Sequence, residues 1–324
     1  MVAFTPANIK LWSRLGSCGA FGQAALALPE LNDNTVMLTA DLCSFSGLER
    51  FKHKYPERFY NVGIAEQNMV GIAAGMAKEG YTPFITTYAT FAAMRCADQI
   101  KVSMGYMNLG IKLVGLTAGC SVGILGPTHM ALEDIAVMRS IPNIIVLSPA
   151  DCTATVKAVL AAAQTNAPVY LRLSGTMGNP IVYKEDFDFK IGKANRLREG
   201  RDICLFATGA MVHNALSAAE FLENEDISVK VIDMHTIKPL DKEAVKEACD
   251  AKLIVSVEEH SQIGGLGSAI AEELSLKKRR PPHLIIGTRD AYPHAGDYAY
   301  LHKIQGLTAE CIAQQLISTY KELS

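Results

Sequence analysis

The sequence predicts an α/β protein of two domains, each a mostly parallel sheet covered by helices. Short, almost continuous apolar runs alternate with longer helical segments through most of the chain. Such runs are typical of strands buried on both faces, and strands that alternate with helices build parallel sheets. The alternation breaks over residues 175–200, and 324 residues are enough for two cores. We therefore divide the chain into domains at residues 1–180 and 190–324.

The first domain begins with a helix and continues with alternating strands and helices. Residues 11–30 predict a helix that Pro29 closes. The predicted strands are Thr35–Ala40, Pro83–Thr87, Ile111–Leu116, Asn143–Leu147 and Val169–Leu173. The helices predicted between and after them are Ala65–Lys78, Thr90–Ser103, His129–Arg139 and Thr153–Thr165. Helices between successive strands are what parallel pairing requires.

The second domain repeats this alternation after a connector rich in turns and charge, in which we expect a hairpin. The predicted strands are Ile203–Thr208, Ser228–Asp233, Lys252–Val257 and His283–Gly287. The predicted helices are Met211–Glu223, Asp241–Ala248, Leu266–Leu274 and Thr308–Tyr320.

Composition excludes several classes of protein. A formal net charge of -2 with scattered lysines and arginines gives no basis for binding nucleic acid or an anionic membrane. The start lacks the layout of a signal peptide, and no apolar run approaches the about 20 residues that span a bilayer. The eight cysteines are widely spaced, without metal-ligand pairs, so we expect free thiols, a cytoplasmic protein and no structural zinc.

Glu66 is the strongest candidate for a catalytic residue. It stands at the start of a helix whose next residues are almost all small or apolar, from Met69 to Ala77. A helix that is apolar all round is buried in a core or between subunits, so this acid is expected to be buried too. The helix dipole favours its ionised form, whereas desolvation favours its neutral form. The plain alternative is an acid that only begins the helix.

Four further features are candidates on position alone. Asp41 directly follows a strand, where ligands of open α/β sheets bind, although an Asp in a turn is equally consistent. Tyr88 and Phe91 fall three residues apart near a helix start and share a face there, as core aromatic pairs also do. His129 stands at a predicted helix start, where Thr128 is the alternative N-cap. Gly264-Gly265-x-Gly267 before a helix resembles a phosphate loop weakly, and tight packing explains it better.

Several motifs resemble one enzyme family over nearly the whole chain. They are IAEQNMVGIAAGMA, GYTPFITTYATFAAMRCADQIK, GPTHMALEDIAVMRSIPNIIVLSPAD and SVEEHSQIGGLGSAIAEEL. Together they resemble the pyrimidine-binding and C-terminal domains of transketolases. Deoxyxylulose-phosphate synthases and the β subunits of 2-oxo-acid dehydrogenases are relatives with the same pyrimidine-binding domain.

The resemblance implies thiamine diphosphate as the cofactor and assigns roles to the candidates. Glu66 matches the acid that bonds the pyrimidine N1′ and performs general acid–base work. Phe91 matches an aromatic residue that stacks on the aminopyrimidine, with Tyr88 as its neighbour, and Asp41 matches an acid near the cofactor. His129, in Gly-Pro-Thr-His, matches a histidine at the substrate. The Glu-Glu-His260 motif recurs in the family, and we assign it no role.

The resemblance covers only part of a full transketolase. The diphosphate-binding domain of that family is marked by Gly-Asp-Gly, which this sequence does not contain. We therefore expect a separate N-terminal transketolase subunit to complete the site and to bind Mg²⁺ or another divalent ion with the diphosphate. The expected assembly is a heterotetramer of the two subunits, and this chain itself is expected to hold no metal.

The sequence departs from transketolases where that family binds sugar hydroxyls and phosphate. Ile124-Leu125 replace an acidic pair, Thr117 replaces a histidine, and Cys18 replaces an arginine, although Arg14 is close by. Gly175 replaces a second arginine and leaves Arg172 as the candidate for substrate contact. Bidentate arginine contacts do not survive such replacements. We therefore expect a sugar or sugar-derivative substrate that is unphosphorylated or otherwise modified.

The main prediction is the C-terminal subunit of a split transketolase-like enzyme that transfers a two-carbon ketol unit between sugars. One alternative is the β subunit of a 2-oxo-acid dehydrogenase or a deoxyxylulose-phosphate-synthase-like enzyme. The other, of a different class, is a non-catalytic subunit that only stabilises a partner. Retention of Glu66, Tyr88 and Phe91 favours a catalytic chain over such a scaffold.

Overall fold

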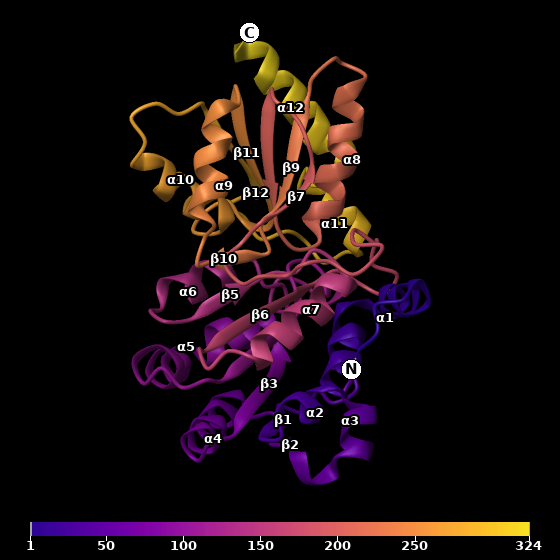
Figure 1. The fold of residues 1–324 in the computed structure, drawn as a ribbon, viewed down its shortest axis with the longest axis vertical. Coiled ribbons are helices and arrows are strands. Elements are labelled where there is room, and N and C mark those ends of the chain that lie inside the picture. Colours follow the sequence, from indigo (N-terminus) through magenta and orange to yellow (C-terminus); the bar gives the residue numbers. More distant parts are fainter. Residues whose placement is uncertain (1, 324) are drawn as a thin grey trace.

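The computed structural model describes residues 2–323 as two α/β units arranged end to end (Figure 1). The N-terminal half forms one unit around a seven-stranded sheet, and most of the C-terminal half forms the other around a five-stranded sheet. Nearly all neighbouring strands run parallel, so the predicted fold class is confirmed. No helix within residues 2–323 is both long and apolar enough to cross a membrane.

The first sheet has the strand order β10-β5-β6-β4-β3-β1-β2. Its strands are β1 (Thr35–Thr39), β2 (Phe59–Asn61), β3 (Thr82–Tyr88), β4 (Lys112–Ala118), β5 (Ile145–Leu147), β6 (Val169–Ser174) and β10 (Thr236–Lys238). Successive side chains of a strand point to opposite faces, and both faces are covered here. In β1, for example, Met37 packs in one core cluster and Leu38 in the other.

Helices cover both faces of this sheet. One face carries α1 (Pro6–Ala25), α2 (Leu28–Leu31), α3 (Glu49–Lys54) and α7 (Cys152–Ala163). The other carries α4 (Glu66–Lys78), η2 (Phe91–Arg95), α5 (Ala97–Ile100), η3 (Lys101–Tyr106) and α6 (Asp134–Ser140). The short 3₁₀ turns η1 (Pro56–Arg58) and η4 (Gly123–Leu125) lie in loops.

The second sheet has the order β12-β11-β8-β9-β7. Its strands are β7 (Asn195–Arg198), β8 (Ile203–Ala207), β9 (Val229–Asp233), β11 (Leu253–Ser261) and β12 (His283–Thr288). The helical segments around it are α8 (Met211–Glu223), α9 (Lys242–Glu247), η5 (Ala248–Asp250), α10 (Leu266–Ser275), α11 (Tyr298–Ile304) and α12 (Ala309–Leu323). Helices α8 and α12 cover one face, and α9 and α10 cover the other (Figure 1).

Three helices differ from the sequence prediction. The first begins at Pro6, where Thr5 caps it, and breaks at Gly16, whose φ of 74° is non-helical. Pro29 does not close this helix; it stands in the first turn of the short α2, where a missing N–H costs nothing. The helix predicted for residues 90–103 is wound partly as π-helix, a form that often marks functional sites.

The predicted hairpin in residues 175–200 is wrong. The connector runs without internal strand pairing until β7, which pairs antiparallel with β9 at the edge of the second sheet. A second surprise is β10, which follows β9 in the chain but pairs antiparallel with β5 of the first sheet. One strand of the second half therefore belongs to the sheet of the first half.

The two units are joined by several polar contacts besides β10. Arg139 of α6 forms an ion pair with Glu272 of α10, with 2.5 Å between Nη2 and Oε2. The Lys238 ammonium donates to the carbonyls of Arg139 and Ile141 at the end of α6. These contacts hold the two sheets in one arrangement and bring β11 against the loop that follows β4.

Candidate active site

Most predicted site residues lie near the carboxyl edge of the first sheet. Strands β4, β3, β1 and β2 are parallel neighbours, so the segments that follow them meet at one edge. Asp41 follows β1, Glu66 follows β2, Tyr88 ends β3, and the loop with His129 follows β4. This is the edge at which open α/β sheets bind ligands.

Glu66 is the first residue of α4, and its side chain is buried, with 3% of the residue exposed. Its carboxylate accepts a hydrogen bond from Arg95, with 2.6 Å between Nη1 and Oε1. Within residues 2–323 this is the one hydrogen bond that the carboxylate makes. The side chain of Arg95 remains 44% exposed, so the ion pair lies where the core meets the surface.

Three aromatic rings gather beside this acid. Tyr88 and Phe91 meet edge to face with 5.9 Å between ring centroids, and His129 lies 5.9 Å from Tyr88 and 5.3 Å from Phe91. Phe45 extends the group on the far side of Tyr88, with a centroid separation of 6.0 Å. Tyr88 ends a strand and Phe91 begins a π-helix, so they do not share one helical face as predicted. They nevertheless meet, and His129 meets both.

Arg95 connects Glu66 to the aromatic group. Its guanidinium carbon lies 4.1 Å from the centre of the Phe91 ring, a cation–π contact, while Nη1 bonds Glu66. The peptide carbonyl of Arg95 also accepts from the side chain of Gln67. The sequence prediction missed Arg95 and Phe45. The position of Arg95, four residues after Phe91 in a helical segment, is the signal that would have identified it.

Asp41 is exposed and begins a turn at the end of β1. Its φ of 58° lies in the left-handed region, which Asp tolerates better than most residues. Its carboxylate accepts from the side-chain amide of Asn61, and its own N–H donates to the same side chain. Asp41 therefore shares the edge of the site, but its partner in this chain is Asn61 rather than the aromatic group.

His129 does not begin a helix, contrary to the prediction. Helix α6 starts at Asp134, and residues 119–131 form a loop closed at its base by two hydrogen bonds between Gly119 and Ala131, both of 3.1 Å. Thr128 is not a helix cap, because its hydroxyl lies 3.0 Å from Nδ1 of His129. The histidine thus projects from a loop, where it contacts Tyr88 and Phe91.

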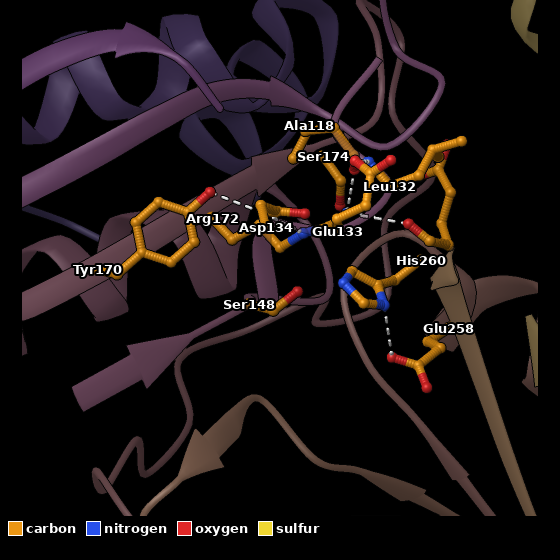
Figure 2. A network of polar contacts seen from close by, with 12 residues as sticks. Ala118, Leu132, Glu133, Asp134, Ser148, Tyr170, Arg172, Ser174, Glu258 and His260 are labelled. Carbon is orange, nitrogen blue, oxygen red and sulfur yellow. Dashed lines mark hydrogen bonds and ion pairs between the residues drawn. The ribbon is translucent and has the colours of Figure 1, made fainter. Parts of the chain in front are cut away.

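Arg172 is the candidate that the structure removes from the site. It lies in β6 with 1% of the residue exposed, and its Nε donates to Asp134 Oδ2 at 2.8 Å (Figure 2). Its Nη2 donates to the carbonyls of Ala131 and Glu259. Tyr170 donates to the same oxygen of Asp134. The prediction of substrate contact for Arg172 is wrong, because its donors join the two units and none faces solvent.

The glycine loop before α10 holds no space for a phosphate. The buried carboxylate of Glu258 accepts the N–H groups of Leu266 and Gly267 at 2.6 and 2.8 Å. A Cβ at Gly265 would lie 2.0 Å from that carboxylate, so glycine is needed for close approach. His260 lies beside Glu258 and accepts or donates through contacts to Ala136 and Ser261 (Figure 2). The favoured interpretation, tight packing, is confirmed.

A cavity of about 710 Å³ lies away from this site, between α8, α11 and the start of α12. Its lining includes His213, Phe221, Tyr298 and His302, and none of the predicted site residues. The candidate site at Glu66 therefore lies on a different part of the molecule from this cavity.

Comparison with known proteins identifies the family. Residues 17–178 match the family described as transketolase, pyrimidine binding domain, and residues 192–312 match transketolase, C-terminal domain. The chain belongs to the transketolase family. It corresponds to the C-terminal section of split transketolases, which is a subunit of its own, and carries both of these domains. The family and the part of it that the sequence predicted are thus confirmed.

Three relatives cover almost the same length as this chain. A putative transketolase C-terminal section of Methanocaldococcus jannaschii is 38% identical over 93% of this chain and 95% of its own. The 6-deoxy-6-sulfo-D-fructose transketolase subunit SqwH of Clostridium sp. is 40% identical over 89% of both chains. The second of the lettered subunits of the apulose-4-phosphate transketolase of Phocaeicola vulgatus is 36% identical over 94% of this chain and 97% of its own.

A solved structure has the same fold over the same length. It is described as a split gene transketolase, inactive beta4 tetramer. The two chains share 38% identity and superpose with a TM-score of 0.85, over 95% of this chain and 98% of that one.

Membership of this transketolase family implies thiamine diphosphate as the cofactor. The residues present fit the pyrimidine end of that group: Glu66 offers a buried carboxylate with bonding capacity left, and Phe91 offers a partly exposed ring next to it. They offer no place for the metal, because residues 2–323 contain no cluster of three or more His, Cys, Asp or Glu side chains arranged to hold one. The chain fits one end of the cofactor.

Proposed function

We propose that this transketolase subunit acts with a separate N-terminal subunit to transfer a two-carbon ketol unit from a ketose donor to an aldose acceptor. The observation that carries the proposal is the arrangement of Glu66, Phe91 and His129. A buried acid, an aromatic face and a histidine meet at the carboxyl edge of the sheet. These are the groups that activating a pyrimidine and binding a sugar require.

When bound, thiamine diphosphate supplies the thiazolium C2 nucleophile that breaks and remakes the carbon–carbon bond. Glu66 binds N1′ of the pyrimidine through its carboxylate and exchanges a proton with that atom. Phe91 supports the ring from one side, with Tyr88 holding Phe91 in place through their edge-to-face contact. The imidazole of His129 faces the same space and bonds a substrate hydroxyl.

The partner subunit completes the site and supplies its own half of the cofactor contacts. Around Glu66, large apolar side chains stand exposed on α4, η2 and η3, among them Ile64 at 78% and Tyr106 at 87%. Met94 and Val102 belong to the same surface. Apolar surface of this extent typically marks a protein–protein interface. The partner binds there, adds the diphosphate and Mg²⁺ or another divalent ion, and pairs into a heterotetramer.

The substrate is a sugar or sugar derivative unlike the usual phosphorylated pentoses. The two replaced positions Cys18 and Thr117 are neighbours, because the thiol of Cys18 bonds the backbone of Thr117. Burial raises the pKa of that thiol to about 11, so this corner carries no charge at neutral pH. Thr117 has a φ of 52°, a strained value for a β-branched residue, and such strain concentrates at functional sites.

Gly175 supports the same view of the substrate. Its φ of +85° and the side chain of Asn179, 2.6 Å from where a Cβ would be, leave no room for an arginine. The relatives named for sulfofructose and apulose phosphate use uncommon sugars. We therefore propose a donor or an acceptor that is unphosphorylated or otherwise modified.

The test is co-expression with the neighbouring gene for an N-terminal transketolase subunit, followed by a screen of ketose donors. The expected result is two-carbon transfer only when both subunits and thiamine diphosphate are present, and with a donor other than xylulose 5-phosphate. Equal turnover of xylulose 5-phosphate and ribose 5-phosphate would refute the substrate proposal. Oxidative decarboxylation of a 2-oxo acid would instead support the alternative dehydrogenase subunit.

A further inference from the structure

The loop that carries His129 is held at its base by the second unit of the molecule. The loop spans residues 119–131, and His129 stands two residues before its end. Its base is the pair of hydrogen bonds between Gly119 and Ala131. The tip exposes Ile124 and Leu125, so the loop depends on its base for order.

Glu259 of β11 reaches the first end of this loop. Its carboxylate accepts the N–H of Cys120 at 2.8 Å, through the same oxygen that lies 3.0 Å from Nε2 of His302. The other oxygen accepts from the hydroxyl of Tyr298 at 3.1 Å. A Cβ at Gly119 would lie 2.4 Å from the carboxylate carbon, so the loop can approach this closely only through glycine.

The backbone beside Glu259 holds the other end of the loop. Arg172 donates through one nitrogen to the carbonyls of Ala131 and Glu259, at 3.2 and 2.9 Å. The N–H of Ser261 donates to the carbonyl of Leu132 at 2.8 Å. Both ends of the loop are therefore fastened to β11, and the side chain of Glu259 fastens the end that the backbone does not reach.

We infer that Glu259 is a positioning residue that holds the loop so that His129 faces Tyr88 and Phe91. The part of this inference that concerns substrate rests on the proposed function. Glu259 itself is 1% exposed and touches neither the aromatic group nor Glu66 in any contact of the described chain, so it acts through the loop. The second domain thereby contributes to the site without supplying a residue that touches the substrate.

Two neighbouring glutamates allow a matched test. Glu259→Gln keeps the shape of the side chain, but its amide nitrogen cannot accept, so one of its three donors loses its partner. Glu258→Gln is the control, because Glu258 is equally buried and bonds only the start of α10. Both substitutions disturb a buried network, but only the first should disturb the loop.

The first measurement is amide hydrogen exchange in the isolated full chain. Residues 119–131 should exchange on the order of tenfold faster in Glu259→Gln and at the wild-type rate in Glu258→Gln. The second measurement uses the reconstituted pair. Glu259→Gln should raise KM for the ketose donor on the order of tenfold, with a smaller change in kcat and unchanged affinity for thiamine diphosphate.

Equal exchange of the loop in the two glutamine variants would overturn the inference, whatever the reconstituted enzyme does. If Glu259→Gln does not fold, Tyr298→Phe removes one donor to the carboxylate and should produce a smaller change of the same kind. Loss of loop protection without any two-carbon transfer by the wild-type pair would leave Glu259 as the support of the loop and refute the proposed function instead.

Discussion

Glu66 in the first domain and Glu258 and Glu259 in the second are all buried, with 3%, 0% and 1% of each residue exposed. Their surroundings differ. Glu258 accepts two backbone N–H groups, and Glu259 accepts one backbone N–H and contacts two side-chain donors. Glu66 has one donor, Arg95, on a side chain that is nearly half exposed.

This difference teaches that burial alone does not identify a functional acid. The argument from sequence that a scaffold has no need of a buried acid is wrong, because Glu258 and Glu259 are such acids in this chain. Glu66 stands apart because it has bonding capacity left and lies beside exposed apolar surface. A buried acid whose bonds the chain fills supports the fold, whereas one left open is available to a ligand.

The largest expected effect comes from removing the acid of Glu66. In Glu66→Gln, two-carbon transfer by the reconstituted pair should fall about 100- to 10,000-fold, because general acid–base catalysis is lost. The melting temperature should change little, since the ion pair with Arg95 is partly exposed. Glu258→Gln should reverse the pattern, with lower stability and nearly normal turnover. Similar losses of turnover in both variants would erase the distinction between the two acids.

Charges placed on the exposed apolar surface should come next. Ile64→Asp or Tyr106→Asp should weaken association with the N-terminal partner by about 2 kcal/mol or more, roughly 30-fold, because a carboxylate would be buried unpaired. The isolated chain should keep its fold, since both side chains are exposed. Leu276→Asp, equally exposed in the second domain, is the control for analytical ultracentrifugation. Association that is unchanged in all three variants would move the interface elsewhere.

Removal of the aromatic face should have a smaller effect. Phe91→Ala should weaken thiamine diphosphate binding to the reconstituted pair about 5- to 100-fold, the usual contribution of one base–aromatic stack. Phe221→Ala is the control, because Phe221 is an exposed aromatic residue of α8. Calorimetric titration measures both. Full affinity in Phe91→Ala would favour a subunit that only stabilises its partner.

The smallest effect is a pH dependence that belongs to the second domain alone. Burial raises the pKa of Asp233 to about 8, and Tyr183 donates to its Oδ2 at 2.7 Å. The folded chain therefore binds this proton more tightly than the unfolded chain, whose aspartates titrate near about pH 4. Stability should fall as pH rises from about 4 to about 8, by up to about 1.4 kcal/mol per unit.

The Asp233→Asn variant should lose that part of the dependence. Urea midpoints at pH 5 and pH 8 should differ less in this variant than in wild type, while the exposed Asp226→Asn should behave like wild type. A wild-type difference retained in Asp233→Asn would mean that another group is responsible.

The sequence predicted most strands and helices of both units to within a few residues. Apolar runs such as Thr35–Thr39 and Ile203–Ala207 are local patterns, and local patterns survive folding when every face is buried. Errors occurred where non-local contacts decide. The strand β10 has only three residues and exists because β5 offers an open edge. The loop before α6 is extended because β11 holds its ends.

The sequence by itself determined the fold class, the family, and Glu66 and Phe91 as candidates, because these depend on periodicity and on motifs of neighbouring residues. Only the tertiary structure decided what Arg172 and Arg95 do. Arg172 bonds residues 38, 41 and 87 positions away, and Arg95 bonds one 29 positions away. Which buried donor finds which acceptor depends on the packing of distant segments, and no local pattern contains that information.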